Sequence, residues 1–79
     1  MVDVADTVIR LIAIELQISE DQVRQAQSLR TDLGMDSIAA ANLMFALEEE
    51  YGVEISLDDV EHLDTLPEIE AVVSRSLVS

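Results

Sequence analysis

The feature that most constrains the fold is a helical spacing of apolar residues that begins close to the N-terminus. These residues are three or four positions apart, which places them on one face of an α-helix. They are Val4, Val8, Leu11, Ile12 and Leu16, and the face is widened by Ala5, Ile9 and Ile14. The spacing predicts a first helix over residues 3–17, with Asp3 or Asp6 near its positive end.

Capping residues predict three further helices. Asp36 is a favourable N-cap and Gly52 a natural stop, so a second helix is expected over 37–51. A short third helix is expected over 57–62. A capping box with proline in the first turn opens a fourth helix over 66–77. The predicted fold class is all-α: a four-helix bundle with three longer helices, one short third helix and a long loop between the first two.

The long loop covers residues 24–35, which show no sustained apolar period. Just before it, Ser19 and Gln22 form an S-x-x-Q capping box, so a short helical turn is expected over 20–23. The loop contains three large apolar residues, Leu29, Leu33 and Met35. We expect these residues to hold it against the core.

The charge of the chain excludes several classes of function. It has 17 acidic residues against 4 Lys plus Arg, a formal net charge of −13. Nothing in it could neutralise a row of nucleic-acid phosphates, and no apolar run approaches the ~20 residues that membrane insertion requires. About a third of the residues are Leu, Ile, Val or Phe, so the chain should fold despite its charge, as one domain over 1–79. The acidic N-terminus does not resemble a signal peptide, which predicts a cytoplasmic location.

Catalytic and metal sites are not indicated, so we do not expect an enzyme. The chain has no cysteine, which excludes disulfides, thiolate metal sites and cysteine nucleophiles. The only histidine, His62, has no spacing to Ser37 and Asp36 that supports a catalytic triad. The segment 32–43 lacks the glycine position and the terminal glutamate of an EF-hand, and no metal ligand set is expected.

The predicted 37–51 helix has two apolar faces. At ~100° per residue, its core face consists of Ala40, Leu43, Met44, Leu47 and Tyr51. A separate arc consists of Ile38, Ala41 and Phe45, close to Glu48 and Glu49. Two interpretations stay open for this arc. Either it is buried against the first helix and the 24–35 loop, or it is an apolar patch that faces a partner.

Ser37 lies where a glycine turn at Gly34 leads into a helix. Helix N-termini present unpaired N–H groups and partial positive charge, which would stabilise a phosphate ester on this serine. Simple capping of the helix by Asp36 and Ser37 would also explain these residue types.

The segment Leu33-Gly34-Met35-Asp36-Ser37-Ile38 resembles the attachment motif of acyl carrier proteins, in which D-S-L follows L-G. The stretch from Ala46 to Ile55 is similar to the family's A-L-E-E-E-F-x-x-E-I, and the resemblance covers essentially the whole chain. It implies that Ser37, within a motif that includes Asp36 and Gly34, receives 4′-phosphopantetheine from coenzyme A through a phosphopantetheinyl transferase. The arm would supply the thiol that the chain lacks.

The resemblance also implies the function and the partners. The protein would carry acyl intermediates as thioesters and shuttle them, as a monomer, between the enzymes of a fatty-acid, polyketide or specialised lipid pathway. Acyl-loading, condensing and tailoring enzymes with basic patches would dock on Ile38, Ala41, Phe45, Glu48 and Glu49. By position, an acyl pocket would be lined by Leu43, Met44, Leu47, Ile55, Val60 and Leu63, which an ordinary core would contain equally.

Three positions depart from the fatty-acid members of the family. Ala39 and Asn42 stand where those members commonly have acidic residues, and Ile38 replaces the usual leucine. The loss of two carboxylates favours a specialised carrier over one that serves the general fatty-acid synthase. Two alternatives remain open: an aminoacyl or peptidyl carrier, and a non-carrier interaction module of the same fold.

Overall fold

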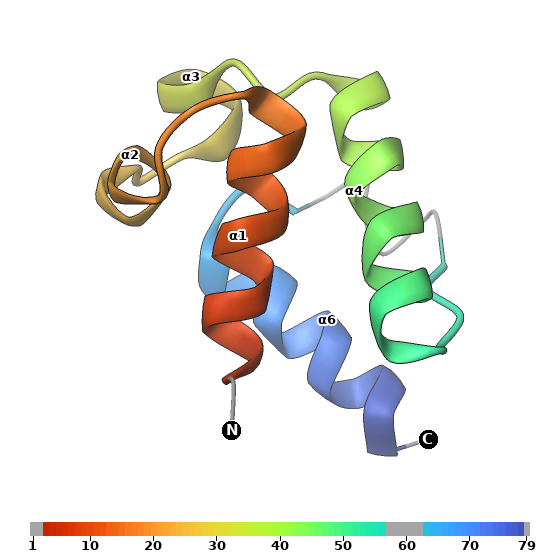
Figure 1. Cartoon of the computed structure of the whole chain (residues 1–79). Helices are drawn as coiled ribbons and strands as arrows, with labels where there is room; N and C mark the ends of the chain where they lie inside the picture. The colour runs from red at the N-terminus through yellow and green to blue at the C-terminus, as the bar shows by residue number, and fades with distance from the viewer. Residues whose placement is uncertain (1–2, 57–62, 79) are drawn as a thin grey trace.

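The structure is a computed structural model that describes residues 3–56 and 63–78. Within these ranges the regular elements are all helices (Figure 1). Three are long, α1 (Val4–Leu16), α4 (Ser37–Tyr51) and α6 (Leu66–Val78), and two are short, α2 (Glu20–Gln25) and α3 (Leu29–Leu33). The all-α class and the three longer helices are confirmed. The predicted third helix at 57–62 lies outside the described residues.

The helices pack around one apolar core. Helix α1 contacts α2, α4 and α6, and it runs antiparallel to α4 in Figure 1, with α6 crossing near the two chain ends. Every described helix contributes to the core, which includes Val8, Ile12, Val23, Leu29, Leu43, Leu47, Ile69 and Val73. Among the described residues, none of the helices combines the length and the apolar character needed to cross a bilayer.

Helix α1 follows its predicted apolar face with one exception. Val8, Ile9 and Ile12 are buried, whereas Ile14 is 65% exposed, so its assignment to the buried face was wrong. Two residues turn an α-helix by about 200°, which carries Ile14 to the side opposite Ile12. Asp3 is the N-cap residue of α1, although its side chain makes no capping hydrogen bond.

The segment 24–35 is not the loop that its lack of periodicity suggested. Helix α2 extends to Gln25, and its predicted capping box between Ser19 and Gln22 is present. Helix α3 follows, with the Ser28 hydroxyl accepting a hydrogen bond from the Thr31 N–H at 3.1 Å. A helix of five residues is too short to show an apolar period, so only its end residues could have predicted it.

The apolar residues of this segment do hold it to the core, as predicted. Leu29 and Met35 are buried, and Leu33 is half-buried and packs against the core. The chain between α1 and α4 therefore forms two short helices that pack on the core, on the side of α1 away from α4 in Figure 1, rather than a free loop.

The capping predictions for the long helices are also confirmed. Asp36 caps α4, and Gly52 ends it with a φ of 65°. At the start of α6, the Thr65 N–H donates to the Glu68 carboxylate at 3.0 Å, and the Glu68 N–H donates to the Thr65 hydroxyl at 3.4 Å. On α6, Ile69, Val72 and Val73 are buried, whereas Leu77 is 44% exposed.

Candidate functional site

Ser37 is the first residue of α4, and it is exposed. The carboxylate of Asp36 accepts a hydrogen bond from the Ala39 N–H at 2.8 Å, and its carbonyl accepts one from the Ala40 N–H at 2.9 Å. The N–H groups of Ser37 and Ile38 have no acceptor in the part of the chain that the structure describes. This helix end therefore presents a free hydroxyl and two free amide donors to solvent.

The turn between α3 and α4 sets this position. Gly34 adopts the left-handed region, with a φ of 70°, and the Met35 N–H donates to the Leu29 carbonyl at 3.1 Å. Met35 is buried, so the next two residues leave the core and reach the surface. A Cβ on Gly34 would meet no atom within 4 Å, so the turn requires glycine for its φ alone.

Asp64 fixes α3 to the segment that precedes α6. Its carboxylate accepts hydrogen bonds from the Ser28 hydroxyl at 2.7 Å and from the Arg30 N–H at 3.0 Å. Its carbonyl accepts the Leu29 N–H at 2.7 Å. The bonds from Arg30 and Ser28 hold the pKa of Asp64 below its ordinary value.

Glu68 completes this connection on the side of α6. Its carboxylate accepts the N–H groups of Asp64 and Thr65, at 3.1 and 3.0 Å, and the Thr65 hydroxyl. The bond from the Asp64 N–H is the main reason that the pKa of Glu68 is lowered. The sequence indicated the capping box of Glu68 but gave no signal for Asp64, because its partners lie more than thirty residues away.

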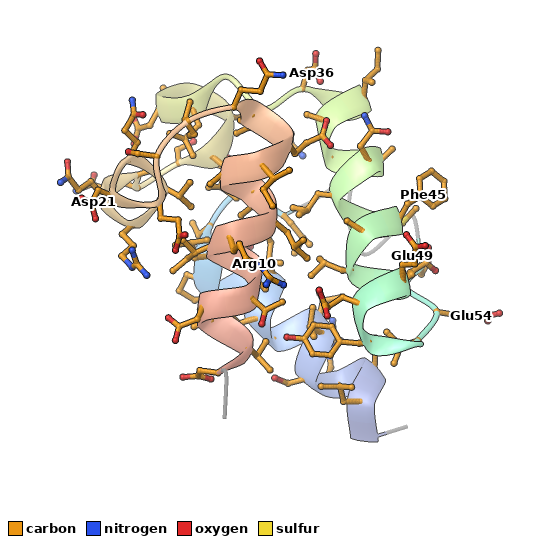
Figure 2. The ribbon with its side chains drawn as sticks, in the orientation of Figure 1. Arg10, Asp21, Asp36, Phe45, Glu49 and Glu54 are labelled. Carbon is orange, nitrogen blue, oxygen red and sulfur yellow. The ribbon has the colours of Figure 1, made fainter. Side chains whose placement is uncertain are left out.

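The second arc of α4 is exposed rather than buried. Ile38 is 73% exposed and Phe45 is 61% exposed, while Ala41 is half-buried between them. Figure 2 shows Phe45 and Glu49 on the side of α4 that points away from α1. The interpretation that this arc packs against α1 and the 24–35 segment is therefore wrong. Next to Ile38, Ala39 is buried, so it joins the core face of α4 although the sequence did not place it there.

Two polar residues of α4 are engaged within the fold. The half-buried Glu48 accepts a hydrogen bond from the Ile55 N–H at 3.0 Å. The Asn42 amide donates to the Glu15 carboxylate of α1 at 3.1 Å. A carboxylate at position 42 would face Glu15 and repel it, which gives a physical reason for asparagine here.

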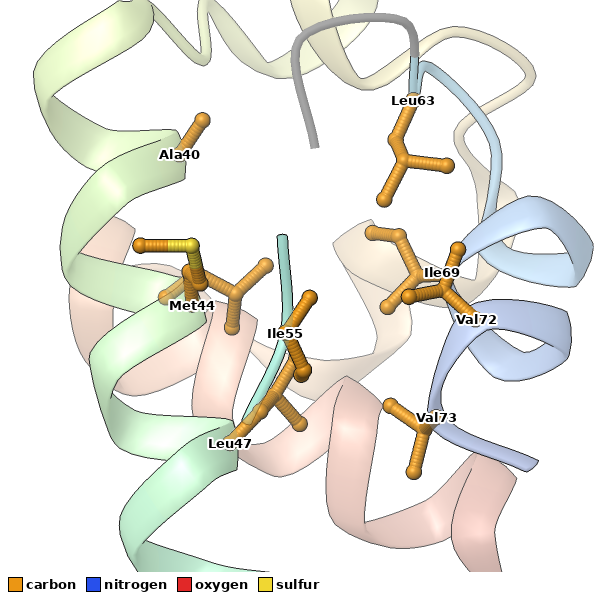
Figure 3. Close-up of a pocket in the computed structure, with 9 residues that line it drawn as sticks. Ala40, Met44, Leu47, Ile55, Leu63, Ile69, Val72 and Val73 are labelled. Carbon is orange, nitrogen blue, oxygen red and sulfur yellow. The ribbon is translucent and has the colours of Figure 1, made fainter. Parts of the chain in front are cut away.

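An apolar cavity of about 20 Å³ lies between α4 and α6 (Figure 3). Of the predicted pocket residues, the structure brings five to this cavity: Leu43, Met44, Leu47, Ile55 and Leu63. Val60 lies outside the described residues. Four residues of the lining were not predicted: Ala40, Ile69, Val72 and Val73. The described lining has no polar side chain, and the free volume is about that needed for one water molecule.

A comparison with protein-family models identifies the chain. The model of the phosphopantetheine attachment site matches residues 6–73. The chain belongs to this family. It is a phosphopantetheine carrier with a covalently attached 4′-phosphopantetheine group, and carriers of this family are not enzymes. Its general partners are a phosphopantetheinyl transferase and the enzymes that act on carried groups.

The N-terminus of α4 in this carrier has the donors that such a group requires. Attachment of a phosphodiester needs an accessible hydroxyl, and N–H donors at a helix N-terminus stabilise its negative charge. Ser37 has an exposed side chain with a hydroxyl, and the two free N–H groups are on Ser37 and Ile38. The Asp36 carboxylate is directed to the Ala39 N–H, which leaves these donors available.

Proposed function

We propose that the carrier holds its phosphopantetheine arm on Ser37. Supporting this are the exposure of the hydroxyl and its place at the first residue of a long helix. In the loading reaction the Ser37 oxygen forms the new bond to phosphorus, and the nucleotide part of coenzyme A leaves. Asp36 and Gly34 serve this site by shaping the backbone, through the cap and the left-handed turn.

We propose acyl groups as the cargo. The observation that carries this proposal is the cavity beside α4, whose described lining is apolar throughout. The arm supplies a terminal thiol, which holds a carried group as a thioester. An aminoacyl group would bring an ammonium to a lining that offers no partner, and burial of an unpaired charge is strongly unfavourable. An aliphatic chain meets no such penalty.

The small volume of the cavity means that the cargo must displace side chains. About 20 Å³ is too little for an aliphatic chain of several carbons. Met44 is suited to such adjustment, because its unbranched side chain has three rotatable bonds. The larger the acyl group, the more the lining residues on α4 and α6 must move.

The docking surface for partner enzymes is the exposed arc of α4. Ile38, Ala41 and Phe45 supply its apolar part, Glu49 lies beside them, and Glu48 is at its edge. Acyl-loading, condensing and tailoring enzymes with basic patches would fit this chemistry, since the chain carries a net charge of −13. The absence of a carboxylate at the exposed Asn42 supports a polyketide or specialised lipid pathway, whereas Ala39 is buried and has no bearing on docking.

Intact-mass spectrometry after loading tests the attachment site. Incubation with coenzyme A, Mg²⁺ and a phosphopantetheinyl transferase should add one phosphopantetheine to the chain. Ser37→Ala should abolish the addition and leave the helical circular dichroism unchanged. Ser74→Ala is the matched control, because Ser74 is also an exposed helical serine but lies on α6. Modification of Ser37→Ala protein would show that another residue holds the arm.

Methyl NMR of loaded protein tests the cargo class. Phosphopantetheine arms that carry a butyryl, an octanoyl or an alanyl group can be transferred from the matching coenzyme A derivatives. Acyl groups should shift the methyl resonances of Ile69, Val72 and Val73, more strongly for octanoyl, whereas alanyl should not. Ile14 serves as the control methyl because it is exposed. Equal shifts with the alanyl group would favour an aminoacyl carrier.

A further inference from the structure

Glu48 makes three hydrogen bonds to the segment that follows α4. Its carbonyl accepts the N–H groups of Gly52 and Val53, at 2.8 and 3.2 Å. Its side-chain carboxylate accepts the Ile55 N–H at 3.0 Å. One residue therefore fixes the course of the chain from the end of α4 to Ile55.

The bond to Ile55 matters because this residue forms a wall of the apolar cavity. Ile55 is buried, and Figure 3 shows its side chain between α4 and α6. It belongs to an irregular segment, so no helical ladder holds its backbone. Within the described residues, the Glu48 carboxylate is the acceptor for its N–H. A hydrogen bond to a charged acceptor is stronger than one to a neutral acceptor. The bond to Glu48 is therefore suited to hold a segment whose backbone has no helical hydrogen bonds.

The neighbouring glutamate has a different setting. Glu49 is exposed, and its carboxylate makes no hydrogen bond or ion pair with the residues that the structure describes. Figure 2 shows Glu49 directed outward beside Phe45. Its carboxylate is free to meet a basic partner, whereas that of Glu48 is committed to the backbone of the same chain.

We propose that Glu48 is a positioning residue for the cargo cavity, because its carboxylate holds Ile55 in the cavity wall. The proposal rests on the proposed acyl-carrier function, and it assigns different roles to Glu48 and Glu49. Glu49 serves partner docking, and Glu48 serves retention of the cargo. Loss of the Glu48 carboxylate would leave the Ile55 N–H without its acceptor and free the wall to move.

NMR of the unmodified protein tests whether the Glu48 carboxylate holds the backbone of Ile55. In Glu48→Ala protein, the Ile55 amide proton should shift and should exchange with solvent roughly tenfold faster than in the wild type. Glu48→Gln keeps a side-chain acceptor and should restore most of the protection. Glu49→Ala, the matched control, should leave the Ile55 amide unchanged. Exchange of the Leu47 amide in α4 reports separately on any general loss of stability.

Several results would contradict the proposal that the Glu48 carboxylate holds the backbone of Ile55. One is an Ile55 amide proton that exchanges with solvent without protection in the wild-type protein. This measurement does not depend on the folding of any variant. Another is an Ile55 amide that is unaffected by Glu48→Ala. A third is an equal response to Glu49→Ala, which would show that neighbouring charge rather than this hydrogen bond determines the signal.

The lifetime of an octanoyl thioester on the loaded protein, measured without any partner enzyme, tests the role in retention. Glu48→Ala should shorten it by up to about tenfold, since the cargo is exposed whenever the wall opens, and Glu48→Gln should restore it. A changed Ile55 amide with an unchanged thioester lifetime would overturn the positioning role. Failure of wild-type protein to accept the arm at Ser37 would instead contradict the proposed function. The spectra of unmodified protein would still show whether Glu48 holds the backbone of Ile55.

Discussion

Phe45 and Leu47 lie two residues apart on α4 and differ sharply in exposure, at 61% and 3%. Leu47→Ala should therefore reduce the free energy of unfolding by ~2–5 kcal/mol, because it leaves a cavity in the core. Phe45→Ala should change it by less than ~0.5 kcal/mol, as is usual for surface substitutions. If partner enzymes cover Phe45, the same change should weaken transfer of the carried group, since full burial of such a side chain contributes ~1.5–3 kcal/mol.

Thermal melts and partner kinetics, recorded for both variants, check this contrast. A Phe45→Ala protein that melts as early as Leu47→Ala would place Phe45 in the core. Normal melting with normal partner turnover would remove Phe45 from the docking surface.

Gln17 is the one described residue other than glycine with a positive φ, at 57°. It caps the C-terminus of α1 in the left-handed region, which costs most side chains roughly 1–2 kcal/mol. Gln17→Gly should therefore raise the free energy of unfolding by ~0.5 kcal/mol, after the added freedom of the unfolded chain is subtracted. The matched control is Gln25→Gly at the end of α2, which should destabilise. Urea titrations measure both, and a destabilised Gln17→Gly protein would contradict the expected relief of strain.

At the scale of the elements, Asp64 and Glu68 make the connection between α3 and α6 sensitive to acid. Their pKa values are lowered from 3.8 and 4.5 by the hydrogen bonds that their carboxylates accept in the folded state. The stability that these bonds contribute is present above the unfolded pKa values and is lost as the pH falls through the lower folded values. Asp64→Asn should therefore lower the melting temperature at pH 7, and its difference from the wild type should shrink below about pH 4.

The difference in melting temperature between Asp64→Asn and wild-type protein reports on Asp64 more directly than the melting temperature of either protein. Acid also neutralises the other carboxylates and relieves their repulsion, which acts on both proteins alike. Glu49→Gln should show no pH-dependent difference of this kind, because Glu49 accepts no hydrogen bond within the described residues. A constant gap between Asp64→Asn and wild type from pH 7 to pH 3 would mean that the Asp64 carboxylate does not hold α3.

At the scale of the whole molecule, the net charge of −13 opposes compaction. The arginines relieve this only in part: Arg10 pairs with Glu50 at 2.9 Å, and Arg24 lies near three carboxylates. Added NaCl, or millimolar Mg²⁺, should therefore raise the melting temperature at neutral pH by screening the repulsion. Calorimetry in chloride rather than sulfate avoids a general salting-out effect. A melting temperature that ignores both salts would mean that the repulsion is too weak to matter.

The boundaries of the three long helices and the start of α2 could be predicted from the sequence, because the interactions that set them are local. The Ser19–Gln22 box, the Asp36 cap, the glycine at 52 and the Thr65–Glu68 box each involve residues at most four positions apart. The apolar spacing likewise placed most of the core. The turn at Gly34 and the helix start at Ser37, where we propose that the arm is attached, could be predicted for the same reason, since both are set by consecutive residues.

The tertiary structure alone decided the features that depend on distant residues. Asp64 meets Ser28 and Arg30 across more than thirty positions, and its capture of α3 could not be read from either segment alone. The exposure of Ile38 and Phe45 depended on where α1 and α6 pack, since the helix itself offered two apolar faces. The turn of the Glu48 carboxylate toward Ile55, rather than toward solvent beside Glu49, was likewise set by the fold of the chain after α4.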